Sequence, residues 1–150
     1  MKEKKKVIAL SGGFNPARKS HIAMILDASK LGDVVIILNS DEWCKRHSWN
    51  GQLFSSYENR EAILKEIPGV VDVISAEDED DTVCKTLKKL KPDFFGNGGA
   101  RDISNTPEVD LCREMGIGTI WYLGDSDDHE LMERAEIYMS IAIAKVYRGD

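Results

Sequence analysis

The chain has 150 residues, 42% of them hydrophobic, and a formal net charge of −6. This size and composition predict one globular domain over residues 1–150 with a full hydrophobic core. The acidic balance argues against a nucleic-acid surface, which needs clustered basic residues. The short basic run at residues 2–6 precedes a strand, and no apolar run long enough for a signal peptide or a membrane span follows it. We therefore expect neither nucleic acid nor membrane as a partner.

Apolar runs that predict strands alternate with helical patterns along the chain. The expected strands are Val7–Leu10, Val34–Leu38, Val70–Ile74, Phe94–Phe95 and Thr119–Leu123. The expected helices are Ser20–Leu31, Glu58–Ile67, Asp81–Leu90, Pro107–Met115 and Glu130–Tyr147. This alternation predicts an α/β fold: a Rossmann-like, doubly wound sheet of five parallel strands in a three-layer α/β/α arrangement.

A glycine turn follows the first strand. Gly12-Gly13 breaks the strand, Asn15-Pro16 turns the chain, and a helix opens near Ser20-His21. A strand, a glycine turn and a helix start in this order present unpaired backbone N–H groups to an anion. His21, in the first helical turn, faces the same place. The pattern predicts a phosphate pocket with an imidazole beside it.

Two further polar loops follow strands, Asn39-Ser40-Asp41 after the second and Asn97-Gly98-Gly99 after the fourth. Ligands of parallel sheets gather at the carboxyl ends of the strands, near a switch in strand order. We therefore expect these loops and the glycine turn to converge on one cleft.

The three cysteines, Cys44, Cys84 and Cys112, are odd in number and lack ligand-like spacing, and the three histidines lie far apart. This usage predicts reduced thiols, a cytoplasmic chain and no dedicated metal site built by the protein alone.

The segment GGFNPARKSH, from Gly12 to His21, resembles the G-x-F-D-P-x-H-x-G-H motif of the cytidylyltransferase-type nucleotidyltransferase superfamily. This superfamily includes glycerol-3-phosphate cytidylyltransferases and similar sugar-phosphate nucleotidyltransferases. The spacing, Phe14, Pro16 and the second histidine match. The resemblance implies that His21 contacts the phosphates at the bond being exchanged and steadies the charge that develops during transfer.

Three positions of this segment depart from the motif. Asn15 replaces the aspartate, Arg18 the first histidine and Ser20 the glycine before His21. A guanidinium at position 18 can bind phosphate in a forked contact, or Arg18 and Lys19 are simply exposed loop cations. Ser20 is a good helix N-cap, and its side chain can also occupy volume that a nucleotide needs.

Two more segments match in the expected order. After the second strand, Lys45 or Arg46 corresponds to a lysine that reaches the triphosphate in relatives, although the segment can equally be an ordinary mobile loop. In Glu58-Asn59-Arg60 the resemblance implies that Arg60 helps to order the active site. An arginine early in a helix gains nothing from the helix dipole, which favours a positioned role over a surface one.

The segment KPDFFGNGGAR, residues 91–101, resembles the family's K-P-D strand and its G-G-D-[RY] turn. Its glycines let the backbone approach a nucleotide closely. Ala100 stands where relatives have the aspartate, whereas Arg101 is kept.

The final motif departs most. Relatives have serine and threonine at the start of the last helix, and this chain has Gly124-Asp125-Ser126-Asp127-Asp128. Aspartates suit a helix N-terminus as structure but repel phosphate unless a cation intervenes.

The resemblance implies transfer of a nucleotidyl group, with CTP favoured over ATP, to a small phosphorylated acceptor, with release of pyrophosphate. Mg²⁺ would accompany the nucleotide, and a homodimer is expected. The predicted catalytic residues are His21, Arg18 and Lys45. The predicted nucleotide-binding residues are Gly12, Gly13, Phe14, Asn15, Ser20, Arg60, Asn97, Gly98, Gly99, Arg101 and Ser126.

Two other functions are open. The first is a nucleotide-binding or structural homologue that keeps the fold without catalysis. The second is a dinucleotide-binding domain, which the absence of G-x-G-x-x-G after the first strand disfavours.

Overall fold

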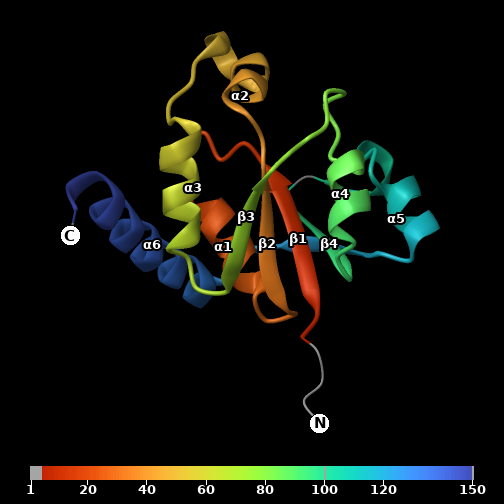
Figure 1. Cartoon of the computed structure of the whole chain (residues 1–150). Helices are drawn as coiled ribbons and strands as arrows, with labels where there is room; N and C mark the ends of the chain where they lie inside the picture. The colour runs from red at the N-terminus through yellow and green to blue at the C-terminus, as the bar shows by residue number, and fades with distance from the viewer. Residues whose placement is uncertain (1–4, 100, 150) are drawn as a thin grey trace.

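A computed structural model describes residues 5–99 and 101–149, and it contains the predicted sheet of five parallel strands (Figure 1). The spatial order of the strands is β3-β2-β1-β4-β5, with every neighbouring pair parallel. Their bounds are β1 Val7–Gly12, β2 Asp33–Leu38, β3 Val70–Ser75, β4 Phe94–Gly98 and β5 Gly118–Leu123. The order reverses between β1 and β4, so a switch point lies there. Ala100 and residues 2–4 of the basic run lie outside the described residues.

Helices cover both faces of the sheet, which confirms the three-layer α/β/α arrangement. Their bounds are α1 Lys19–Ala28, α2 Asp41–His47, α3 Tyr57–Lys65, α4 Cys84–Leu90, α5 Val109–Met115 and α6 His129–Ile143. In Figure 1, α1, α3 and α6 lie on one side of the sheet and α4 and α5 on the other. The helix α2 stands above the carboxyl ends of the strands, beyond both layers.

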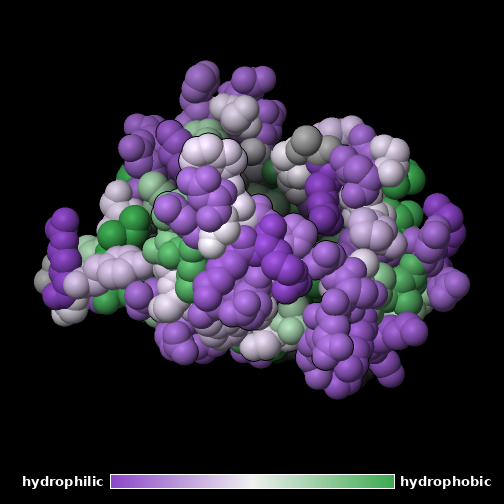
Figure 2. Space-filling view, turned by 90° about the horizontal axis from the view of Figure 1, so that it is seen from above, coloured by the Kyte–Doolittle hydropathy of each residue, from purple (hydrophilic) through white to green (hydrophobic). Residues whose placement is uncertain are grey.

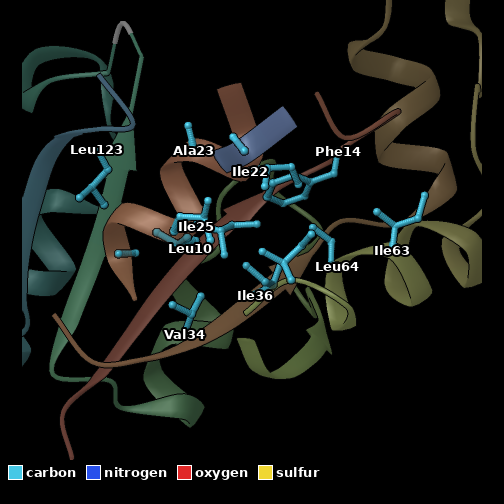
Figure 3. Packing of buried hydrophobic residues seen from close by; sticks show 14 of the residues in the cluster. Leu10, Phe14, Ile22, Ala23, Ile25, Val34, Ile36, Ile63, Leu64 and Leu123 are labelled. Carbon is cyan, nitrogen blue, oxygen red and sulfur yellow. The ribbon is translucent and has the colours of Figure 1, made fainter. Parts of the chain in front are cut away.

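The strands are apolar on both faces because both faces are covered. In β1, Ile8 and Leu10 join one buried cluster with α1, α3 and α6, whereas Ala9 between them joins a second cluster with α4 and α5. Figure 3 shows the first cluster, where Ile22 and Ile25 of α1 pack over Leu10 and Ile36. Since side chains alternate along a strand, this register determines which residues of β1 face each helical layer.

Several predicted helix boundaries are wrong by a few residues. The helix α1 begins at Lys19 with Arg18 as its N-cap, so Ser20 is inside the helix and is not the cap. Pro107 is not the first residue of α5, because Glu108 is the N-cap and the helix begins at Val109. The last helix ends at Ile143 and continues as a short π-helix over Ala144–Arg148.

The predicted helix Asp81–Leu90 begins only at Cys84, because the acidic residues before it form turns. Asp78 accepts hydrogen bonds from the backbone N–H groups of Lys85 and Thr86, and Asp80 accepts one from that of Thr82. The third helix is also shifted and starts at Tyr57, where the Ser56 hydroxyl caps Asn59. Capping side chains, rather than the apolar pattern, thus set these starts.

The segment after β2 is a helix rather than a mobile loop. Ser40 accepts a hydrogen bond from the Trp43 N–H and caps α2. Asp41 and Glu42 occupy its first turn, and three basic residues, Lys45–His47, occupy its last. This distribution of charge suits the helix dipole at both ends. A short 3₁₀ turn, Trp49–Gly51, then leads towards α3.

Candidate functional site

A cavity of about 790 Å³ opens at the switch point, beside the carboxyl ends of β1, β4 and β5. Its wall is made by the end of β1, the first turns of α1, the end of β4 with the turn that follows it, and the segment from β5 to α6. Figure 2 looks down on this end of the molecule, where hydrophilic residues predominate. Seven predicted site residues line the cavity: Ser20, His21, Asn97, Gly98, Gly99, Arg101 and Ser126.

His21 is held in one orientation at the cavity wall. Its Nδ1 accepts a hydrogen bond of 2.9 Å from the backbone N–H of Arg18. Its ring packs edge-on against Phe14, with 5.0 Å between the ring centroids. Burial, and next the positive charge of Arg18, lower the pKa of His21 below its usual 6.5. The imidazole is therefore neutral at neutral pH, and its proton is on Nε2, since Nδ1 is an acceptor.

The end of β4 brings bare backbone to the cavity. The predicted strand Phe94–Phe95 is longer than expected and runs to Gly98, so Asn97 and Gly98 lie in the strand rather than in a loop. A Cβ at Gly98 would lie 2.7 Å from the Leu123 carbonyl oxygen, so only glycine fits there. Gly99 has a φ of +61° and open space around it. These two residues leave room for a ligand to approach the main chain.

Arg101 provides a cation at the cavity wall. Its side chain is 45% exposed, and its Nη1 lies 3.6 Å from Oε1 of Glu108. Apart from that contact, the described residues give its guanidinium no polar partner. Most of its N–H donors are therefore available to an anion in the cavity.

At the start of α6, aspartate side chains of the same segment accept hydrogen bonds from backbone N–H groups. Asp128 accepts a hydrogen bond of 3.1 Å from the Leu131 N–H, and Asp125 accepts one of 2.9 Å from the Asp127 N–H. Asp125 and Ser126 line the cavity, and Asp127 and Asp128 do not. Asp128, which replaces one of the family's hydroxyl residues, thus has a structural partner, as its position at a helix N-terminus predicts, whereas Asp127 contributes its backbone N–H.

The structure places the glycine turn beside the cavity rather than in its wall. A Cβ at Gly13 would lie 2.9 Å from the Trp43 ring, and Gly12 faces Phe14, which is buried with a φ of +50°. The Asn15 side-chain oxygen accepts hydrogen bonds from the N–H groups of Phe54 and Ser55. This turn therefore packs against α2 and the segment before α3.

Arg60 is fully buried and holds the same region together. Its guanidinium donates to the carbonyl oxygens of Ser55, Gly13 and Asn39 at 3.0, 2.7 and 2.8 Å. It also pairs with Asp41 at 2.7 Å. Arg60 thus fixes the glycine turn relative to the start of α2, and its donors are used within the protein.

The loop Asn39-Ser40-Asp41 lies at the expected edge of the sheet but not at the expected cleft. Asn39 is buried, and Ser40 and Asp41 line a separate hollow of about 220 Å³ beside Tyr57 and Ser75. The predicted meeting of three loops in one cleft is therefore wrong for this loop, because β2 lies on the opposite side of β1 from the switch point.

The other two predicted catalytic cations lie outside the cavity wall. Lys45 is exposed on α2 and pairs with Glu42 at 3.5 Å. Arg18 is exposed at the start of α1, next to His21 in the fold. Of the predicted catalytic residues, only His21 lines the cavity.

The end of β5 contributes wall residues that the sequence analysis missed, among them Tyr122 and Gly124. Tyr122 has a φ of +61° and a largely exposed side chain. Gly124 has a φ of +78°, and its N–H donates to Asp27 of α1 at 3.0 Å. The rule that ligands bind at strand ends next to a switch point could have predicted that the end of β5 contributes to the site.

Within residues 5–99 and 101–149, no three His, Cys, Asp or Glu side chains gather closely enough to hold a metal ion. The cysteines Cys44, Cys84 and Cys112 are free thiols. Over the same residues, no helix is both long and apolar enough to cross a membrane.

Comparison with known proteins identifies the family. The family model described as cytidylyltransferase-like matches residues 9–115. The bifunctional protein HldE of Streptomyces coelicolor is 30% identical over 132 residues, which is 86% of this chain and 28% of that protein. The HldE protein of Campylobacter concisus is 34% identical over 115 residues, 76% of this chain and 24% of that protein. The chain thus spans about a quarter of the length of these two relatives.

A solved structure with the same fold is the lipopolysaccharide core biosynthesis protein from Thermoplasma volcanium. Its TM-score is 0.64 and its sequence identity 20%, with 81% of this chain and 98% of that chain covered. The family match, the order of the motifs and the parallel sheet agree, and the chain belongs to the cytidylyltransferase-like family of the nucleotidyltransferase superfamily.

Proposed function

We propose that this protein transfers a nucleotidyl group from a nucleoside triphosphate, CTP in preference to ATP, to a small phosphorylated acceptor. Pyrophosphate is the second product. The observation that carries the proposal is the cavity at the switch point. It brings a neutral imidazole, bare glycine backbone and a half-exposed guanidinium to one wall.

In this reaction an oxygen of the acceptor attacks the α-phosphorus, and the bond from that phosphorus to the bridging oxygen of pyrophosphate breaks. Such transfers need positioning and charge stabilisation more than covalent help from the protein. The Nε2–H of His21 is a donor with a fixed direction, because the Arg18 N–H holds Nδ1. Arg101 supplies positive charge at the same wall. In this proposal, Arg18 and Lys45 support His21 in stabilising the phosphates.

Mg²⁺ is proposed to enter with the nucleotide rather than to reside in the protein. This ion is commonly bound by one or two carboxylates together with substrate phosphates. Asp125 places one carboxylate at the cavity wall, which suits such shared coordination. The bound ion would offset the repulsion between Asp125 and the triphosphate. We therefore expect CTP to bind this chain more tightly with Mg²⁺ than without it.

A phosphorylated sugar is the first acceptor to test. The support comes from the structural neighbour, which is described as a lipopolysaccharide core biosynthesis protein. The curated relatives are called bifunctional, and this chain matches about a quarter of each. Glycerol phosphate is the second acceptor class, in line with the motif resemblance.

The competing proposal is a homologue that binds nucleotide without turning it over. The capping of α6 favours it, because the Asp128 carboxylate already holds the Leu131 N–H that a phosphate would otherwise approach. The discriminating measurement is turnover, since both proposals require a nucleotide site.

A thermal-shift screen over CTP, ATP and their mono- and diphosphates, with and without Mg²⁺, tests binding. A ligand at a hundred times its dissociation constant stabilises the fold by about 2.7 kcal/mol. Pyrophosphate release with sugar phosphates then tests transfer. We expect His21→Gln to lose release, whereas His129→Gln, an exposed histidine outside the cavity wall, keeps it. Binding without release by the wild-type chain would favour the competing proposal, and no binding at all would contradict both.

We also propose that the protein forms a homodimer in the cytoplasm, as the resemblance implies. Ile137 and Ile141 of α6 are exposed apolar side chains that an association could cover. Light scattering that shows only monomer at high concentration would contradict the dimer.

A further inference from the structure

A buried carboxylate lies behind the cavity wall. Glu108, the N-cap of α5, has a side chain that is only 3% exposed. Its Oε2 accepts a hydrogen bond of 3.0 Å from the Val83 N–H at the start of α4. Its Oε1 is buried and, among the described residues, has no hydrogen-bond partner. A buried charged oxygen without a partner is costly unless a nearby opposite charge compensates it.

Arg101 is the compensating charge. Its Nη1 lies 3.6 Å from Oε1 of Glu108, within the range of an ion pair but longer than a hydrogen bond. The negative charge of Glu108 also acts on its own surroundings. Burial, and next this carboxylate, raise the pKa of the Cys112 thiol to about 11. The Glu108 side chain therefore has two separate tasks, in which Oε2 holds α4 and Oε1 faces the arginine of the cavity.

We infer that Glu108 is a positioning residue, which anchors one end of the Arg101 guanidinium so that its remaining N–H donors face the phosphates of the bound nucleotide. An anchored guanidinium loses less side-chain freedom when it binds an anion than a free one does. The half-exposed state of Arg101 fits this arrangement, since one end is held and the other is open to the cavity. The inference rests on the proposed nucleotide site.

Glu108→Gln separates the two tasks, because the amide oxygen can still accept from Val83 while the charge next to Arg101 is removed. We expect the dissociation constant for Mg-CTP to rise about fivefold, a typical coupling between neighbouring groups. Added to Arg101→Gln, the same change should have no further effect. Unchanged or tighter binding by Glu108→Gln would overturn the inference, and so would an equal loss in the Arg101→Gln background.

Asp110→Asn is the matched control. Asp110 lies on the same helix and also pairs with an arginine at 3.6 Å, but this pair with Arg113 is exposed and outside the cavity wall. We expect wild-type affinity for Mg-CTP from this variant. Thermal melts of all variants check that the fold is kept.

A measurement without nucleotide distinguishes this inference from the proposed function. Phenylglyoxal modifies accessible arginines, and peptide mass spectrometry reports the rate at Arg101 alone. We expect this rate to rise about fivefold in Glu108→Gln, as the restraint on the guanidinium is lost. If the wild-type chain binds no nucleotide, the proposed function fails, and equal modification rates would then overturn the anchoring of Arg101 as well.

Discussion

Arg60 and Arg101 lie on opposite sides of the end of β1, and they show how one residue type serves two purposes. Both match family motifs and both were predicted to contact nucleotide. Towards β2, the Arg60 side chain is 0% exposed and donates to three carbonyl oxygens and one carboxylate. Towards β4, Arg101 is 45% exposed and has one ion pair.

The difference shows that internal hydrogen bonds hold the side of the glycine turn towards β2, whereas the side towards β4 has donors that a ligand can use. Arg60 is buried and uses four of its five N–H donors within the protein, so it acts by holding the turn and α2 in place. A guanidinium with open donors at a cavity wall is suited to binding. Substitution of Arg60 should therefore lower mainly the free energy of unfolding, whereas substitution of Arg101 should lower mainly the affinity for the ligand.

Arg60→Met should give the largest effect on stability. The variant keeps the side-chain volume but leaves three buried carbonyl groups and Asp41 without their donor. We expect the free energy of unfolding to fall by about 3 kcal/mol, measured by urea denaturation. Arg113→Met removes an exposed arginine with a surface ion pair and should change it by no more than about 0.5 kcal/mol. Similar losses from both variants would remove the contrast between the two sides of β1.

Arg101→Gln should show the reverse pattern. Glu108 is buried and loses its compensating charge, so we expect the free energy of unfolding to fall by about 1–2 kcal/mol, less than in Arg60→Met. The affinity for Mg-CTP should fall about tenfold, because a charge-assisted contact to phosphate is lost. Titration calorimetry measures this change. Full affinity in the variant would show that the ligand does not reach this wall of the cavity.

The sequence predicted the fold well because hydrophobic alternation determines which segments are buried. Some of the boundaries that failed, such as the start of α3, were decided by capping side chains. Ser40, with acidic residues after it and basic residues at 45–47, was a readable signal for α2, but the sequence analysis left an ordinary mobile loop open there. The contact of Glu108 with the start of α4 was harder to foresee, since its partner Val83 is 25 residues away.

The site was predicted in part, for a physical reason. A motif places residues along the chain but does not say which way a side chain points or what it contacts. Gly98 and Arg101 line the cavity, whereas Gly13 and Asn15 of an equally strong motif pack against α2 and the segment before α3. Tyr122 was missed because no motif marks the end of β5, although the strand-end rule points to it.

The two aspartates at the start of α6 offer a finer test of the cavity side. Asp128 caps the helix, whereas the carboxylate of Asp127 makes no hydrogen bond or ion pair within residues 5–99 and 101–149. Asp128→Ser should lower the free energy of unfolding by about 0.5 kcal/mol, because serine can cap but lacks the charge that suits the helix dipole. Asp127→Ser should leave it unchanged. Urea denaturation of the two variants checks this difference.

Both changes should raise the affinity for CTP, since each removes a negative charge from the segment that follows Asp125 and Ser126 of the cavity wall. The gain should be larger without Mg²⁺, when no cation offsets the repulsion. Calorimetric titration with and without the ion checks this order. Weaker binding after either substitution would show that the carboxylates help to hold the nucleotide complex.

The smallest expected effect concerns the protonation of His21, and it tests how firmly the cavity side is built. Burial and then the Arg18 charge lower the pKa of His21, so the unfolded chain takes up this proton at a higher pH than the folded chain. The contribution of His21 to the free energy of unfolding is therefore complete above its usual pKa of 6.5 and is lost as the pH falls below it.

His21→Gln removes this dependence of the free energy of unfolding on pH. Between about pH 7.5 and about pH 5.5, urea midpoints should fall less in His21→Gln than in the wild type, and His129→Gln should follow the wild type. An equal fall in all three proteins would mean that the imidazole at the cavity wall is as free to take up a proton as one in the unfolded chain, and the rigid donor that the Arg18 N–H creates would not exist in solution.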